Sequence, residues 1–261
     1  MRHAVITAGT KGLGKKVTEA FLQNGYSVSI TYFKDEHAVE KLKEEWKESL
    51  HKIAFFQGDI TDKSFIKQVV TKTMERFGRI DCLINNAGPY IFERKKLVEY
   101  TDEEWEYIIN GNLNSVFYFL KEVIPIMRNQ HFGRIVNYGF QGANSSSGWI
   151  YRSAFSAAKV GLASLTKTIA YEEAEYGITS NMICPGDIAG EMKEASIAES
   201  KGREDTRKTP IGRSGTGEDI ARLILFLCNE NSDLLTGDVI EITGGLDVIH
   251  KHRHLPINDA K

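Results

Sequence analysis

The segment TAGTKGLG (residues 7–14) joins a short apolar run, AVIT (4–7), to a stretch that carries Leu13, Val17 and Phe21 at helical spacing. A β-branched run, then glycines, then a helical period predict a strand, a tight turn and a helix. Glycines let the backbone approach a pyrophosphate closely, and the start of a helix presents N–H donors and positive potential. The segment therefore predicts the first βα unit of a nucleotide-binding sheet.

The rest of the chain repeats this alternation of strand and helix. Further runs typical of strands lie at 27–32, 52–56, 81–85, 133–138, 178–184 and 238–242. Helical patterns lie between them, at about 36–50, 62–77, 102–129 and 153–176. Such alternation implies parallel strands with right-handed crossovers. The sequence predicts an α/β fold with a single doubly wound, Rossmann-type parallel sheet of seven strands, helices on both faces, and ligands at the carboxyl ends of the strands.

The length of the chain favours one domain. Its 261 residues are 41% hydrophobic and show no linker or repeat, and chains of this size commonly build a single core. We predict one domain over residues 1–249 and a flexible tail over 250–261. The tail holds His250, His252 and His254, for which a frayed terminus is a simpler interpretation than a metal site. We predict no bound metal.

Charge and cysteine content narrow the class of partner. The formal net charge is −2 with mixed signs, which gives no reason to expect nucleic acid or a membrane. The three cysteines, Cys82, Cys184 and Cys228, each lie in an apolar run. Their odd number and unpaired spacing favour buried thiols over disulfides or zinc ligands. No run approaches the roughly 18 apolar residues of a membrane span, and we predict a soluble, cytoplasmic protein.

With these elements in place, the chain resembles the short-chain dehydrogenase/reductase family over about residues 3–247, particularly its 3-oxoacyl-carrier-protein reductase-like branch. The first turn of that family reads Thr-Gly-x-x-x-Gly-x-Gly. Here Thr7, Gly12 and Gly14 match, while Ala8 stands at the first glycine position and is followed by Gly9. The resemblance implies a nicotinamide cofactor, a small-molecule or acyl-thioester substrate, and a homodimer or homotetramer joined through the two long helices.

Other family segments follow in order. GDITD carries Asp59, similar to the residue that addresses the adenine ring, and NNAG (85–88) resembles the cofactor-supporting turn. Asn112 resembles the helix asparagine that holds a proton-relay water, and CPG (184–186) would face the nicotinamide. The resemblance implies these cofactor-binding residues: Thr7, Gly9, Lys11, Gly12, Leu13, Gly14, Lys34, Asp59, Ile60, Asn86, Ala87, Gly88, Lys159, Pro185, Gly186 and Ile188.

The choice between NAD and NADP depends on charge near the adenosine ribose. A 2′-hydroxyl is held by a carboxylate at the end of the second strand, whereas a 2′-phosphate repels one and attracts cations. The second strand ends in Tyr32, where NAD-type members of the family carry an acid. Lys11 in the glycine-rich turn and Lys34 beyond the strand supply positive charge. The sequence favours NADP(H).

The proton-handling positions depart from the family pattern. Members use a tyrosine and a lysine four residues apart, on one helix face, together with a serine after the fifth strand. Lys159 matches the lysine, which also binds the nicotinamide ribose in the family. Phe155 stands at the tyrosine position, and in VNYGF Phe140 stands at the serine position. Neither phenylalanine can give a proton to a developing alkoxide.

Three interpretations remain open. In the first, another group gives the proton: Tyr151, eight residues before Lys159, would serve if its loop folds over the pocket, although packing is the commoner role for such an aromatic residue. In the second, the chain binds NADP(H) without catalysis, as a sensor or assembly partner. In the third, a substrate such as an activated double bond needs no acid, and Phe140 and Phe155 line an apolar slot.

The cost of losing one acid decides which interpretation we favour. A missing general acid lowers a rate by about 10²–10⁴ rather than abolishing it. We therefore predict an NADPH-dependent oxidoreductase with Lys159, Asn112 and Tyr151 as catalytic residues and Phe140 and Phe155 in the substrate pocket. The polar segment 191–209 is either a mobile lid over this site or a solvated surface helix.

Overall fold

The computed structural model describes residues 1–204 and 209–249, so the three tail histidines lie outside the described residues. Seven strands form one sheet: β1 (His3–Ile6), β2 (Ser27–Tyr32), β3 (Ile53–Gln57), β4 (Cys82–Asn85), β5 (Gly133–Tyr138), β6 (Ile178–Pro185) and β7 (Val239–Ile242). All neighbouring pairs are parallel, in the order β3-β2-β1-β4-β5-β6-β7. The predicted Rossmann-type fold is confirmed.

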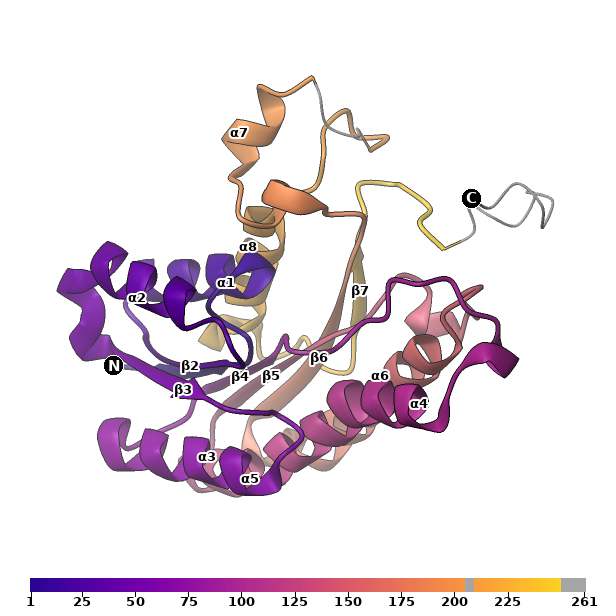
Figure 1. The fold of residues 1–261 in the computed structure, drawn as a ribbon. Coiled ribbons are helices and arrows are strands. Elements are labelled where there is room, and N and C mark those ends of the chain that lie inside the picture. Colours follow the sequence, from indigo (N-terminus) through magenta and orange to yellow (C-terminus); the bar gives the residue numbers. More distant parts are fainter. Residues whose placement is uncertain (205–208, 250–261) are drawn as a thin grey trace.

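Helices cover both faces of the sheet (Figure 1). One face carries α1 (Gly12–Gln23), α2 (Glu36–Glu45) and α8 (Gly217–Leu227), and the other carries α3 (Lys63–Phe77), α4 (Asp102–Ile109), α5 (Ser115–Gln130) and α6 (Ser153–Glu172). The strand pleat divides the core in two: Ala4 and Ile6 pack on the α1 and α8 side, and Val5 packs on the α3 and α5 side. Alternate side chains of a strand point to opposite faces, so both layers of helices are held by the same strands.

The chain changes direction across the sheet between β1 and β4. β1 pairs with β2 on one side and with β4 on the other, so the connections after these strands diverge. Open α/β sheets bind ligands in the crevice at such a point, beyond the carboxyl ends of the strands. The β1–α1 turn and the turn after β4 both end there, which positions the site.

The predicted long helix over 102–129 is divided. Between α4 and α5 the segment Asn110–Asn114 is a π-helical turn, and π-turns are frequent at functional sites. Asn112 lies within it and is fully buried. The extra residue of the π-turn therefore sets the direction in which Asn112 faces.

Other boundaries differ where local hydrogen bonding replaces the α-helix. The helix expected over 36–50 ends at Glu45 and continues as a 3₁₀ segment, Lys47–Lys52. The helix expected to reach residue 176 ends at Glu172. Helix α8 has no counterpart among the predicted helices; Thr216 caps it by accepting a hydrogen bond from Asp219 N.

The polar segment that follows β6 forms two short helical pieces rather than one long surface helix. It contains a 3₁₀ turn, Gly190–Lys193, and α7 (Ile197–Lys201), which stands above the sheet in Figure 1.

All three cysteines are buried free thiols, as predicted. Within residues 1–204 and 209–249, we find no helix with the length and apolar character needed to cross a bilayer.

Candidate active site

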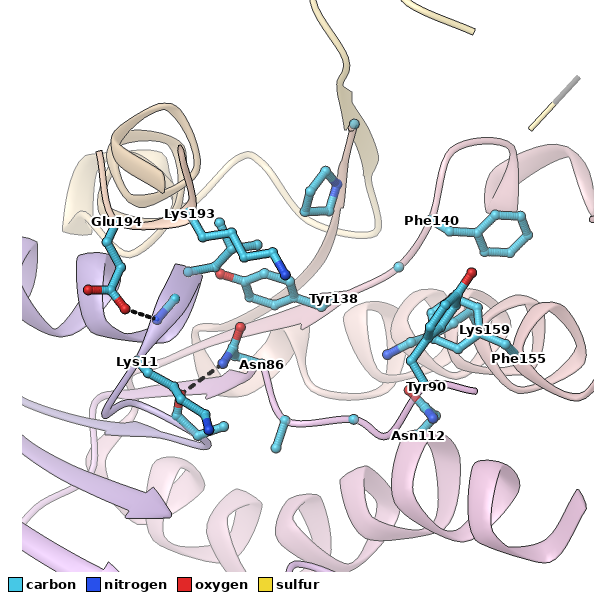
Figure 2. A pocket seen from close by; sticks show the side chains of 18 of the residues that line it. Lys11, Asn86, Tyr90, Asn112, Tyr138, Phe140, Phe155, Lys159, Lys193 and Glu194 are labelled. Carbon is cyan, nitrogen blue, oxygen red and sulfur yellow. Dashed lines mark hydrogen bonds between the residues drawn. The ribbon is translucent and has the colours of Figure 1, made fainter. Parts of the chain in front are cut away.

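A cavity of about 770 Å³ lies at the carboxyl edge of the sheet. Its walls come from the turns after β1, β4, β5 and β6, from the π-turn and α6, and from the segment 190–194 (Figure 2). Its lining includes the following predicted site residues: Lys11, Gly12, Leu13, Asn86, Ala87, Gly88, Asn112, Phe140, Phe155, Lys159, Pro185 and Gly186. The structure thus brings most of the predicted site residues to one cavity.

The glycine-rich turn has the backbone shape that the motif requires. A Cβ added to Gly14 would lie 2.1 Å from Ala8 O, so only glycine lets the helix start this close to the turn. Ala8, at the family's first glycine position, has φ +52°, a left-handed conformation that strains a residue with a Cβ. The turn keeps its shape despite this alanine.

The turn after β4 is fastened to the turn after β1. Thr7 Oγ1 accepts a hydrogen bond from Ala87 N at 2.8 Å, and Asn86 Nδ2 donates to Thr7 O and Ala8 O at 3.0 and 3.2 Å. Thr7 is buried and, with Gly9 and Gly14, supports the cavity without lining it. These bonds make two turns that lie far apart in the sequence into one rigid cradle.

A carboxylate occupies the start of helix α1. Gly12 N donates to Glu194 Oε1 at 2.6 Å, and Glu194 Oε2 lies 3.8 Å from Lys15 Nζ. The first N–H groups of a helix, with their positive potential, favour an anion. In this structure the anion is supplied by the segment after β6 (Figure 2), so the segment predicted as a lid or surface helix reaches the cavity.

An adjoining hollow of about 190 Å³ lies between the ends of β2 and β3. Asp59 and Ile60 line it, together with Phe33 and Tyr107. Asp59 Oδ1 accepts from Thr61 N at 2.8 Å, which fixes the carboxylate at the rim. The dimensions and the aromatic lining suit a purine ring.

The predicted cations of the ribose region have partners in the structure. Lys11 Nζ lies 3.4 Å from Asp35 Oδ2, and both side chains are largely exposed. Lys34 Nζ lies 4.8 Å from the centre of the Phe33 ring, outside the lining of the hollow. Asp35, which also caps α2 by accepting from Ala38 N, is the acid that the sequence prediction overlooked.

Lys159 and Asn112 face the same point of the cavity. An added Cβ on Gly88 would lie 2.3 Å from Asn112 Oδ1 and 3.6 Å from Lys159 Nζ. Asn112 Nδ2 donates to Pro89 O and Ile108 O, whereas its buried Oδ1 has no partner among the described residues. Burial lowers the pKa of Lys159 to about 8. A buried acceptor and a desolvated ammonium side by side are suited to hold a water or a hydroxyl.

Aromatic rings form the opposite wall. Phe140 stacks on Trp149 with ring centroids 5.4 Å apart and planes at 16°, and Phe155 meets Trp149 edge-on at 6.1 Å. Tyr90 packs edge-on against Phe155 at 5.0 Å. Trp149 and Tyr90 line the cavity but were not among the predicted site residues. Tyr90 lies two residues beyond NNAG, which is the one signal that could have found it.

Tyr151 is not brought to Lys159. It has φ +64°, and it lines a separate surface hollow with Leu97 and Ile150 rather than the cavity. Tyr151 lies in the turn before α6 and is half-buried there. Ile188 is likewise outside the cavity lining: it packs in the core and borders a different hollow beneath β7.

Comparisons with known proteins identify the family of the chain. A family model described as enoyl-(acyl carrier protein) reductase matches residues 7–247. A Bacillus subtilis protein named "Putative oxidoreductase YtkK" is 64% identical over 97% of this chain and 99% of its own. The 3-oxoacyl-(acyl-carrier-protein) reductase FabG of Thermotoga maritima is 36% identical over 93% of this chain and 96% of its own.

The chain belongs to the short-chain dehydrogenase/reductase family. A solved structure titled as a putative 3-oxoacyl-reductase from Bacillus thuringiensis has a TM-score of 0.91 at 62% identity and covers 96% of this chain and 100% of its own. An acetoacetyl-CoA reductase of Shinella zoogloeoides is 33% identical over 94% of this chain. The chain is accordingly an oxidoreductase of this family.

Proposed function

We propose that this protein is an NADPH-dependent reductase of small acyl thioesters, 3-oxoacyl thioesters in the first place. The observation that carries the proposal is the single cavity in which the Gly12 cradle, the Lys159–Asn112 pair and the aromatic wall are continuous. The reductases named among its relatives support the substrate class. Fold alone would not, because function resides in the site.

The residues present fit a dinucleotide. Lys11, Gly12 and Leu13 line the cavity at the start of α1, where helix N–H groups suit a pyrophosphate once the Glu194 carboxylate has moved from Gly12 N. The hollow beside Asp59 takes the adenine, and the orphaned Asn112 Oδ1 with Lys159 marks the nicotinamide ribose. When bound, the dinucleotide supplies the hydride. Lys11 and the absence of an acid at Tyr32 favour the 2′-phosphate of NADPH.

The chain's own side chains orient the substrate and exclude water. Lys159 holds ribose hydroxyls, while the rings of Phe140, Trp149 and Phe155 form a dry surface for an acyl group. Holding the reacting groups together supplies several kcal/mol of the rate enhancement. The two phenylalanines at the usual hydroxyl positions contribute shape and cannot contribute a proton.

A nucleotide binder without activity receives no support from the comparisons, since the curated relatives are named as oxidoreductases and reductases.

We also propose that the protein acts in the cytoplasm as a homodimer or homotetramer. The long helix α5 presents a large exposed side chain, Phe117. Light scattering on the purified chain measures the assembly directly.

A substrate panel tests the proposed function. Acetoacetyl, longer 3-oxoacyl and enoyl thioesters, with quinones and pterins as other carbonyl classes, are followed by the loss of NADPH absorbance. We expect turnover of a 3-oxoacyl thioester with NADPH and a lower kcat/KM with NADH. Nucleotide binding with no turnover of any compound would refute the proposal in favour of the silent binder.

A further inference from the structure

The substrate half of the cavity contains a phenol that the family pattern does not explain. Tyr90 lines the cavity together with Asn112 and Lys159 and packs edge-on against Phe155 at 5.0 Å. Lys159 Nζ lies 5.6 Å from the centre of the same Phe155 ring. Tyr90 and Lys159 thus both contact the residue that replaces the family tyrosine (Figure 2).

A guanidinium is fixed against this phenol. Arg152 Nε donates to Tyr90 Oη at 2.5 Å, and its Nη1 and Nη2 donate to Glu93 O and Phe92 O at 2.6 and 2.9 Å. Arg152 precedes the first residue of α6, so the helix that carries Lys159 also sets the guanidinium. A hydrogen bond from a charged donor is stronger to an anionic oxygen than to a neutral one, so Arg152 stabilises a phenolate.

We propose that Tyr90 gives the proton in the reduction and that Arg152 positions it and stabilises the phenolate that results. This inference rests on the proposed function. As a hydride from the reduced nicotinamide adds to the carbonyl carbon, the π electrons of the C=O bond move to oxygen. The Oη–H bond of Tyr90 then breaks, and its proton joins that oxygen. Tyr90 is half-buried, so water can return the proton.

The other phenols near the cavity are placed less well. Tyr138 lines the cavity, but its hydroxyl points away from Phe155 (Figure 2), and burial raises its pKa. Tyr151 lies outside the cavity lining. Lys159 is therefore the main rival donor, and the experiment must separate it from Tyr90.

The first test is Tyr90→Phe, which removes one oxygen and keeps the ring against Phe155. We expect kcat for a 3-oxoacyl thioester to fall about 10²–10⁴-fold, the usual cost of losing a general acid, while NADPH affinity changes less than about twofold. Tyr171→Phe is the matched control, because Tyr171 is on α6 and 78% exposed. It should keep the wild-type rate.

The second test is rescue. Phe155→Tyr in the Tyr90→Phe background puts a hydroxyl one helical turn from Lys159, and kcat should recover at least about tenfold. Arg152→Gln tests the positioning role. It should lower kcat more than it changes KM, whereas mere loosening of the loop would change KM as well.

A third readout needs no cofactor and no turnover. Binding of a 3-hydroxyacyl thioester, the product, to the cofactor-free protein is followed through tryptophan fluorescence, because Trp149 lines the cavity. Tyr90→Phe should weaken this binding about five- to tenfold, because one hydrogen bond to the product hydroxyl is lost. Tyr171→Phe should bind it as the wild type does.

The outcomes separate the two proposals. If the wild type turns over no thioester, the proposed function fails and this inference falls with it. If the wild type turns over substrate and Tyr90→Phe keeps the full rate, Tyr90 is not the donor, although the proposed function stands. If Tyr90→Phe keeps the full rate at neutral pH and loses it as the pH rises, with a midpoint near pH 8, the proton donor is Lys159. Burial lowers the pKa of Lys159 to about 8.

Discussion

The cofactor half and the substrate half of the cavity differ in what builds them. The cofactor half is made of backbone: Gly14 passes so close to Ala8 O that a Cβ would lie 2.1 Å from it. The substrate half is made of side chains: Phe140, Trp149, Phe155 and Tyr90 pack on one another. A backbone shape admits few substitutions, whereas packed side chains can be exchanged when their neighbours compensate. We therefore expect the family pattern to vary less in the first half than in the second.

The largest expected effect tests whether the aromatic wall is structural. Phe140 is 3% exposed and stacked on Trp149, so Phe140→Ser, which introduces the residue that the resemblance predicts there, leaves a void and a buried hydroxyl. We expect the free energy of unfolding to fall by about 3–5 kcal/mol, measured by denaturant titration. Phe92→Ser is the control, since Phe92 is 81% exposed and should cost less than about 1 kcal/mol. If Phe140→Ser lowers the free energy of unfolding as little as Phe92→Ser does, the aromatic wall of the cavity tolerates a serine at position 140.

The cofactor half should be most sensitive at its closest backbone approach. Gly14→Ala forces the start of α1 away from the turn after β1, and we expect NADPH affinity to fall about 10–100-fold, equivalent to 1–3 kcal/mol of overpacking. This occurs although alanine favours a helix interior. Fluorescence titration measures it. Gly148→Ala is the control, because a Cβ there meets nothing within 4 Å, and it should bind NADPH as the wild type does. An unchanged NADPH affinity in Gly14→Ala would show that the close backbone approach at Gly14 is not needed for cofactor binding.

The sequence predicted the backbone half better than the side-chain half, for physical reasons. Strand periodicity and glycine turns are local signals, so β2 and β5 have the predicted bounds. The contact of Gly12 with Glu194 joins residues 182 positions apart, and no local pattern encodes it. Tyr151 is left out of the cavity lining and has a left-handed backbone conformation, which the sequence does not mark. Trp149 lies in a loop without periodicity, and its stacking on Phe140 is visible only in three dimensions.

Lys159 lies at the boundary between the cofactor half and the substrate half of the cavity. The pH dependence of NADPH affinity shows whether its charge acts on the cofactor. Burial lowers its pKa to about 8. An anionic cofactor binds the charged form better, so affinity is highest below pH 8 and falls above it, by up to about tenfold per pH unit. Titrations of NADPH between about pH 7 and pH 9.5 measure this slope. Lys159→Met should bind weakly with a flat profile; a flat wild-type profile would place the lysine's role in the substrate half.

The Glu194 carboxylate at the start of α1 competes for the place of the pyrophosphate. Glu194→Gln keeps an acceptor for Gly12 N but removes the charge, so we expect NADPH affinity to rise about three- to tenfold, as a competing closed state is weakened. Glu45→Gln is matched, because Glu45 also pairs with Lys15, at 3.1 Å, without contacting Gly12. It should leave affinity unchanged. A fall in affinity in Glu194→Gln would mean that this segment holds the cofactor rather than opposing it.

The smallest effect concerns the choice of nucleotide. Asp35 Oδ2 lies 3.4 Å from Lys11 Nζ, where a 2′-phosphate would compete with it for the same cation. Asp35→Asn retains the cap of α2, since asparagine caps as well as aspartate. We expect NADPH affinity to rise about two- to fivefold, the scale of an exposed ion pair, with NADH binding unchanged.

Lys11→Met is the companion variant for this position, and it should weaken NADPH alone. The opposite pattern for Asp35→Asn, with NADH binding lost and NADPH binding unchanged, would show that Asp35 holds a ribose 2′-hydroxyl. The backbone half would then be intact but built for NADH, because the acid missing at Tyr32 would have been supplied three residues later in the chain.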